Sequence, residues 1–283
     1  MPPRSSPTAR QARLGAELRK LREAAGLSTT EAGVLLGGNQ AQISHIEAGR
    51  WGVSAARVRQ LAVHYEAANL ELVDALCSMA EERGRGWWDE YRETLAPGFL
   101  DVAELEHRAT FLRSLQTVTL PGLLQTADYV RAIHSSRIPA LSADAVDLRV
   151  EFRVRRSQVL ERDEPPPFEA FVHEAALRMR YGGRKVTQAQ LGHLRAVSER
   201  STVTVRVIPF TYEGFIEATQ PVLYVGGVLK ELDTVRLDSA MGGRIVHAEA
   251  GLDKYRAQFE LADRAALDVE GSRRLIRDIE REL

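Results

Sequence analysis

Short apolar repeats in the N-terminal quarter of the chain alternate with residues that start and end helices. Apolar side chains spaced three or four residues apart predict a first helix from near residue 10: Leu14, Leu18, Leu21 and Ala25. Gly26 is predicted to end this helix, because glycine readily adopts the left-handed conformation that closes helices. Four more helices are expected, over about 28–36, 40–48, 54–65 and 70–84.

The ends of these helices carry recognisable capping residues. Ser28 and Glu31 have the spacing of a capping box, in which each side chain accepts the other's free backbone N–H. The Gly37-Gly38 pair is predicted to end the second helix, and Asn39 to cap the third. Short helices joined by short turns predict a compact all-α domain.

In the remainder of the chain, segments with the three-to-four-residue apolar spacing of helices are mixed with segments whose apolar and polar residues alternate, as in strands. Helices are predicted over 101–115, 126–137, 142–162, 187–199, 252–267 and 272–283. Strands are predicted over 168–174, 202–210, 221–227, 234–239 and 243–249. Val203, Val205 and Val207 alternate with polar residues, which is typical of a half-buried strand, and Thr187 with Gln190 suggests a capping box.

These patterns predict a multidomain protein, with an all-α domain followed by an α+β domain. The segment "EERGRGWWDE" changes composition abruptly and marks the boundary. The expected divisions are a disordered tail over 1–9, a helical domain over 10–75, a linker over 76–86 and an α+β domain over 87–283.

Charge is distributed unevenly along a chain whose net charge is −1 over 283 residues. Nine basic and four acidic residues lie up to residue 65, so that segment is +5 and the remainder is −6. A basic head on an acidic body indicates a polyanion partner. The single cysteine, Cys77, lies among apolar residues, which is typical of a buried thiol.

Residues 28–50 meet the geometric demands of a helix-turn-helix. Gly33 provides the small residue where two helices approach closely, and Gly37-Gly38 provides the turn. Ile43 and Ile46 lie on one face of the second helix and are predicted to tie it to the core. The outer face carries residue types that suit base edges: Gln40, Ala41, Gln42, Ser44 and His45.

The stretch "LRKLREAAGLSTTEAGVLLGGNQAQISHIEAGR" resembles the DNA-binding domain of the Xre family, the lambda-repressor-like regulators. The resemblance covers residues 10–66 and implies a recognition helix that reads double-stranded DNA in the major groove. It implies base contacts from Gln40 and His45, whereas Gln42 and Ser44 face either bases or solvent. Phosphate contacts are implied for Thr29, Asn39 and Arg50.

The same resemblance implies a structural ion pair between Arg22 and Glu47. The sequence departs from the family at Ala32, where a larger apolar residue is common, and at Gly33, where alanine is common. Both departures are expected to loosen the core slightly. The family binds palindromic operators, so a homodimer is expected.

Residues 87–283 resemble the large C-terminal domain of actinobacterial Xre-type regulators, which are abundant in Streptomyces and related genera. The most specific pieces are "PGLLQTADYVRAI" and the "RGWW" start. Members often occur beside a gene for a very small protein. The resemblance therefore implies a transcriptional regulator with a ligand-sensing or partner-binding domain. The alternative is an antitoxin-like protein that sequesters a small partner, with DNA binding secondary.

Nothing in the chain predicts catalysis, a cofactor or a metal. The seven histidines lack metal spacing, and "HEAAL" at His173 lacks the second histidine of a zinc protease helix. No run of about 18 apolar residues predicts a membrane helix, so a cytoplasmic, nucleoid-associated protein is expected. One aromatic group either lines a ligand pocket or, as favoured here, packs the domain: Trp87, Trp88, Tyr91 and Phe99.

Overall fold

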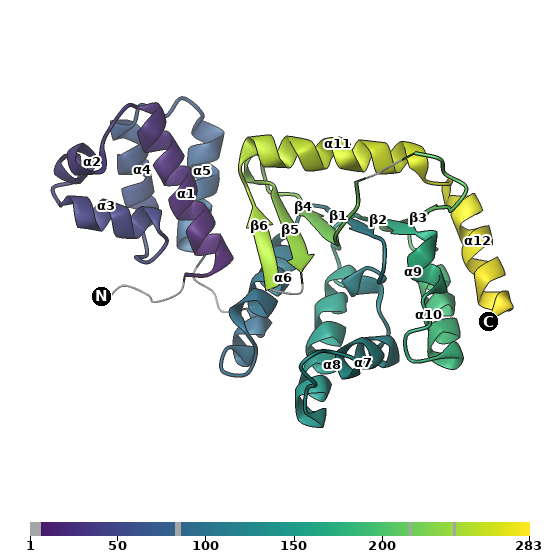
Figure 1. Cartoon of the computed structure of the whole chain (residues 1–283). Coiled ribbons are helices and arrows are strands. Elements are labelled where there is room, and N and C mark those ends of the chain that lie inside the picture. The colour runs from purple at the N-terminus through teal and green to yellow at the C-terminus, as the bar shows by residue number, and fades with distance from the viewer. Residues whose placement is uncertain (1–6, 83–85, 215–216, 240–241) are drawn as a thin grey trace. The chain divides into compact units, whose positions relative to one another are not determined.

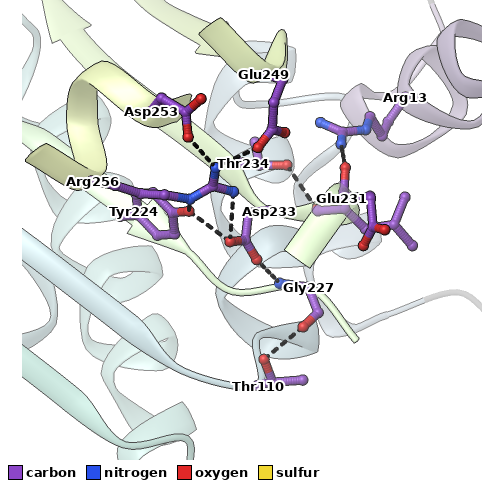
Figure 2. Close-up of polar contacts among 11 residues, drawn as sticks. Arg13, Thr110, Tyr224, Gly227, Glu231, Asp233, Thr234, Glu249, Asp253 and Arg256 are labelled. Atoms are coloured by element: carbon purple, nitrogen blue, oxygen red, sulfur yellow. Dashed lines mark hydrogen bonds and ion pairs between the residues drawn. The ribbon is translucent and has the colours of Figure 1, made fainter. Parts of the chain in front are cut away.

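The computed structural model describes residues 7–82, 86–214, 217–239 and 242–283 (Figure 1). Contacts within the chain divide it into two compact units. The first comprises Met1–Leu105 together with Val228–Glu231, and the second comprises Glu106–Gly227 together with Leu232–Leu283. No helix in the described ranges combines the length and the apolar character that crossing a membrane requires.

The first unit is helical, as the apolar periodicity predicts. Its main helices are α1 (Ala9–Ala24), α2 (Thr29–Leu35), α3 (Gln40–Glu47), α4 (Ala55–His64) and α5 (Leu70–Glu81). A 3-10 turn, η1 (Trp87–Tyr91), and most of α6 (Pro97–Arg108) follow. Apolar side chains from α1, α3, α4 and α5 form its core. The most deeply buried are each at most 1% exposed: Leu18, Ile43, Val58, Leu61 and Leu76.

The predicted caps are present at the starts of α2 and α3. Ser28 N–H donates to Glu31 Oε2 at 2.8 Å, and Glu31 N–H donates to Ser28 Oγ at 3.2 Å, which completes the capping box. Asn39 Oδ1 accepts the backbone N–H of Gln42 at 3.0 Å. Gly37 has a φ of +65°, so the turn between the two helices needs glycine there.

Two predicted boundaries differ in the structure. The expected linker over 76–86 begins inside α5, because Leu76, Cys77 and Ala80 form the buried face of that helix. The expected tail over 1–9 is already structured at its end, where Thr8 caps α1; residues 1–6 lie outside the described ranges.

The second unit is built on a six-stranded mixed sheet with the strand order β3-β2-β1-β4-β5-β6. Its strands are β1 (Leu112–Gln116), β2 (Phe168–His173), β3 (Val203–Ile208), β4 (Val222–Val225), β5 (Thr234–Ser239) and β6 (Gly242–Val246). β1, β2 and β3 run parallel, whereas β4 pairs antiparallel with both β1 and β5, and β6 pairs antiparallel with β5. The all-α and α+β fold classes are therefore both confirmed.

Helices cover the sheet and one of its edges (Figure 1). The longest, α11 (Glu249–Ala265), lies along one face and buries Phe259 against Leu115 and Val235. The C-terminal α12 (Val269–Glu282) covers the edge strand β3, where Ser272 Oγ accepts the N–H of Val207 at 2.9 Å. The remaining helices are α7 (Ala127–Ser135), α8 (Ala143–Ser157), α9 (Glu174–Arg178) and α10 (Arg184–Val197), with 3-10 turns at Gly122–Leu124, Gln158–Leu160 and Lys230–Leu232.

Two predictions in this unit are wrong. The helix expected over 101–115 ends at Arg108, and its last residues form β1, a central strand paired on both sides. Thr187 and Gln190 do not cap a helix, because α10 begins earlier, after Gly183. Both side chains are buried, and Gln190 instead fixes a turn by accepting the N–H of Thr126 at 2.7 Å.

Candidate nucleic-acid interface

Close backbone approach sets the angle between α2 and α3. A Cβ on Gly33 would lie 2.6 Å from the carbonyl carbon of Asn39, which is shorter than any ordinary contact. Gly33 is therefore required at this position, and Ala32 beside it is fully buried. At Gly33 the close backbone contact leaves no room for the alanine methyl group; the expected effect of Ala32 on core packing stays a prediction. On the other side of the turn, a Cβ on Gly38 would collide with the amide oxygen of Gln42.

The inner face of α3 is anchored by apolar burial and by α1. Ile43 and Ile46 are 1% and 4% exposed. A Cβ on Gly15 of α1 would lie 2.6 Å from the carbonyl oxygen of Ile46, so the two backbones are in direct contact. Gly49, with a φ of +69°, ends α3 against the backbone of Gln11. The orientation of α3 is thus fixed by contacts on three sides.

Arg22 and Glu47 lie together as the family resemblance implies. Arg22 Nε donates to Glu47 Oε1 at 2.6 Å and Nη2 donates to Oε2 at 3.0 Å, which is the bidentate geometry of a strong pair. Arg22 Nη1 also donates to the carbonyl of Leu27 at 2.5 Å. The hydrogen bond to Glu47 raises the pKa of Arg22. One guanidinium therefore joins α1, the turn before α2, and the end of α3.

The four candidate base-reading residues on the outer face of α3 differ in how exposed their side chains are. Gln40 and Ser44 are exposed, whereas Gln42 and His45 are half-buried. The ring of His45 stacks on Trp51, with centroids 5.0 Å apart and planes 29° apart, so one ring face is covered. Gln42 lies against the Gly38 turn. The side chains of Gln40 and Ser44 are the ones that project freely from this face.

The three candidate phosphate contacts differ in exposure and in how many of their polar atoms are already hydrogen-bonded. Asn39 Oδ1 is occupied by the helix cap, which leaves Nδ2 as its donor to a phosphate. Thr29 is half-buried at the start of α2. Arg50 is exposed directly after α3.

Most of the basic side chains in this unit form ion pairs with carboxylates of the same chain. Within the described residues up to His64, six basic side chains have carboxylate partners: Arg10, Arg13, Arg19, Lys20, Arg22 and Arg59. Only Arg50 and Arg57 have none in this part of the chain. Arg57, in the first turn of α4, is a candidate phosphate contact that sequence reasoning missed, since every arginine looks equally free before the pairing is known.

Other residues that the sequence singled out have structural roles. His173 Nδ1 accepts the N–H of Ala175 and so caps α9, rather than forming part of a zinc motif. No cluster of three potential metal ligands occurs in the described ranges. The aromatic rings of η1 contact each other edge to face, with centroids 5.9 Å apart for Trp87 and Trp88, and Trp88 and Tyr91 are buried. This arrangement is the one expected for packing.

Comparison with known proteins defines the class of the chain. Residues 13–76 match the family described as a helix-turn-helix domain, which supports a DNA-binding regulator. Residues 99–278, more than half of the chain, match the family described as domain of unknown function (DUF5753). The chain belongs to this DUF5753 family and carries the helix-turn-helix domain at its N-terminus. No curated protein and no solved structure matches the chain.

Proposed function

We propose that the chain is a sequence-specific transcriptional regulator that inserts α3 into the major groove of double-stranded DNA. The observation that carries this proposal is the division of α3 into a rigidly anchored inner face and a polar outer face, with Gln40 and Ser44 exposed. Glutamine can pair bidentately with adenine, and serine can donate or accept one bond. Gln40 is the principal base contact, Ser44 is a second, and the edge of the His45 ring and Gln42 contribute at the margin.

Phosphate contacts fix the register of α3 on the duplex. Arg50 and Arg57 supply positive charge, and Asn39 and Thr29 supply neutral donors at helix N-termini. The chain acts as a homodimer on a palindromic operator, with its recognition helices about 34–36 Å apart. It is an Xre-type actinobacterial regulator, acts in the cytoplasm on the nucleoid, and is not an enzyme. The C-terminal unit senses a ligand or a partner.

Binding to the DNA upstream of its own gene, measured by fluorescence anisotropy over a range of salt concentrations, tests this proposal. Two unpaired arginines per protomer predict about four phosphate contacts for a dimer, and hence a slope of log K against log salt of about −4. Arg50→Ala should weaken all sequences alike and reduce the slope by about 1 per protomer. Gln40→Ala should cost about 1–3 kcal/mol on the operator only and relax one position.

Arg19→Ala is the matched control, because Arg19 is exposed but already paired with Glu23 on α1. It should leave both affinity and slope unchanged. The assignment of the reading face fails if Gln40→Ala binds the operator as the wild type does. A small protein that copurifies with the chain and displaces DNA would instead favour the sequestering alternative.

A further inference from the structure

The sheet face that points away from α11 carries polar side chains in its interior. Leu115 and Val235 face α11, so their neighbours Ser114 and Arg236 face the other way. Ser114, Leu223 and Arg236 are cross-strand neighbours in one row of the sheet. Ser114 is only 2% exposed. Ser114 Oγ accepts a hydrogen bond from Gln116 Nε2 at 3.0 Å, so this buried hydroxyl is partnered. The charged side chains near this face remain to be paired.

Two arginines of α8, Arg153 and Arg156, lie in the electrostatic neighbourhood of β5. One of them, Arg156, forms a bidentate ion pair with a carboxylate. Arg156 Nε donates to Glu106 Oε2 at 2.8 Å and Nη2 donates to Glu106 Oε1 at 2.5 Å, with both residues buried. The bidentate pair neutralises both charges. On β5, Arg236 Nε donates to Asp238 Oδ1 at 3.0 Å. The two carboxylates near this site are therefore each bound to an arginine.

Arg153, one turn before Arg156, has no carboxylate partner among the described residues. Its Nη1 donates to the neutral Oε1 of Gln125 at 2.7 Å. The Gln125 amide is itself held in place, because its Nε2 donates to the carbonyl of Leu120 at 2.6 Å. Burial, followed by the charge of Arg156, lowers the pKa of Arg153, so the site disfavours the cation it contains. Arg153 as a whole residue is half-buried.

The two guanidinium groups converge on the turn at Gly122. A Cβ on Gly122 would lie 2.6 Å from Arg153 Nη1 and 3.5 Å from Arg156 Nη2. The charges of Arg156, Arg236, Glu106 and Asp238 all act on Arg153. Glu106 pairs with Arg156 and Asp238 with Arg236, which leaves the charge of Arg153 without a carboxylate of its own. An anion would supply the missing partner and would use the guanidinium donors that Gln125 leaves free.

We propose that Arg153, with Arg156 beside it, binds the oxyanion of a small molecule, a phosphate or a carboxylate group, inside the C-terminal unit. The planar guanidinium binds two oxygens of either group in parallel hydrogen bonds. Gln125 orients Arg153, and Glu106 holds Arg156 in position without neutralising Arg153. The site is independent of DNA binding and remains if the assignment of α3 fails.

Isothermal titration calorimetry on the full-length protein without DNA tests this site. Inorganic phosphate is titrated in one arm and succinate in the other, each against sodium chloride at equal ionic strength. At least one arm should show saturable binding. Arg153→Gln should raise the Kd about tenfold to a hundredfold, the value of a hydrogen bond to a charged group. Arg131→Gln is the matched control, because it removes an exposed arginine of α7 that pairs with Asp147.

The two arms identify the chemistry of the ligand. Binding of phosphate alone assigns a phosphoryl group, binding of succinate alone assigns a carboxylate, and binding of both supports a general oxyanion site. The proposal is overturned if neither anion binds above the chloride control, or if Arg153→Gln binds as the wild type does. Should Arg153→Gln fail to fold by circular dichroism, Arg153→Lys keeps the charge and loses the planar fork. Unchanged affinity in that variant also overturns the proposal.

Discussion

The ion pair between Arg22 and Glu47 should stabilise the first unit only as a complete pair. Both side chains are 8% exposed, so removal of one leaves the other charge buried without its partner. Arg22→Met or Glu47→Met alone should therefore cost about 3–5 kcal/mol. The double variant leaves no buried charge. It loses the bond to the carbonyl of Leu27 and the longer contact of Arg22 with exposed Glu23, so it should cost about 1 kcal/mol.

Urea unfolding of the full-length protein, followed by tryptophan fluorescence, measures these free energies. All three tryptophans, Trp51, Trp87 and Trp88, belong to the first unit, so their emission reports on that unit. Arg19→Met is the control, because its pair with Glu23 is exposed, screened by solvent and expected to contribute little to stability. The reasoning is refuted if Arg22→Met costs no more than this control, or if the two single losses simply add in the double variant.

Three further substitutions test packing and charge, each measured by urea unfolding. Gly33→Ala forces a methyl group against the backbone of Asn39 and should cost about 1–3 kcal/mol, whereas Gly52→Ala meets open space and should stay within about 0.5 kcal/mol. Arg156→Gln leaves Glu106 buried and unpaired and should cost about 3–5 kcal/mol by circular dichroism. Burial lowers the pKa of His134 to about 4, below its ordinary 6.5, so stability should fall as pH drops from 6.5 towards 4. The loss at pH 5 should be about 2 kcal/mol, and His134→Phe should remove it.

Local sequence signals were sufficient for the helical unit because its elements are short and individually capped. The Ser28 capping box, the Gly37-Gly38 turn and the spacing of Ile43 and Ile46 each have a local physical cause, and each is present in the structure. Burial of the α5 face up to Ala80 is a tertiary effect, and composition alone placed the boundary too early.

Local sequence patterns did not identify the central strand β1 or the role of buried Gln190. Leu112–Gln116 pairs on both sides and is nearly all buried, so it lacks the alternation that identifies a half-exposed strand. Thr187 and Gln190 have the spacing of a capping box, but Gln190 bonds to residues more than sixty positions away. No local pattern encodes such a partner.

The basic side chains that remain unpaired in the structure, rather than the number of charged residues in the sequence, indicate where each unit can bind an anion. In the helix-turn-helix unit, pairing reduces the basic side chains available for DNA to Arg50 and Arg57 among the described residues, so affinity must depend on base contacts more than a net charge of +5 suggests. In the C-terminal unit, pairing leaves a positive charge on Arg153 although the sequence beyond residue 65 is acidic. A cation that a fold desolvates without a counter-ion raises the free energy of that fold. Binding of an anion there would lower it, and the unit would be most stable when its ligand is bound.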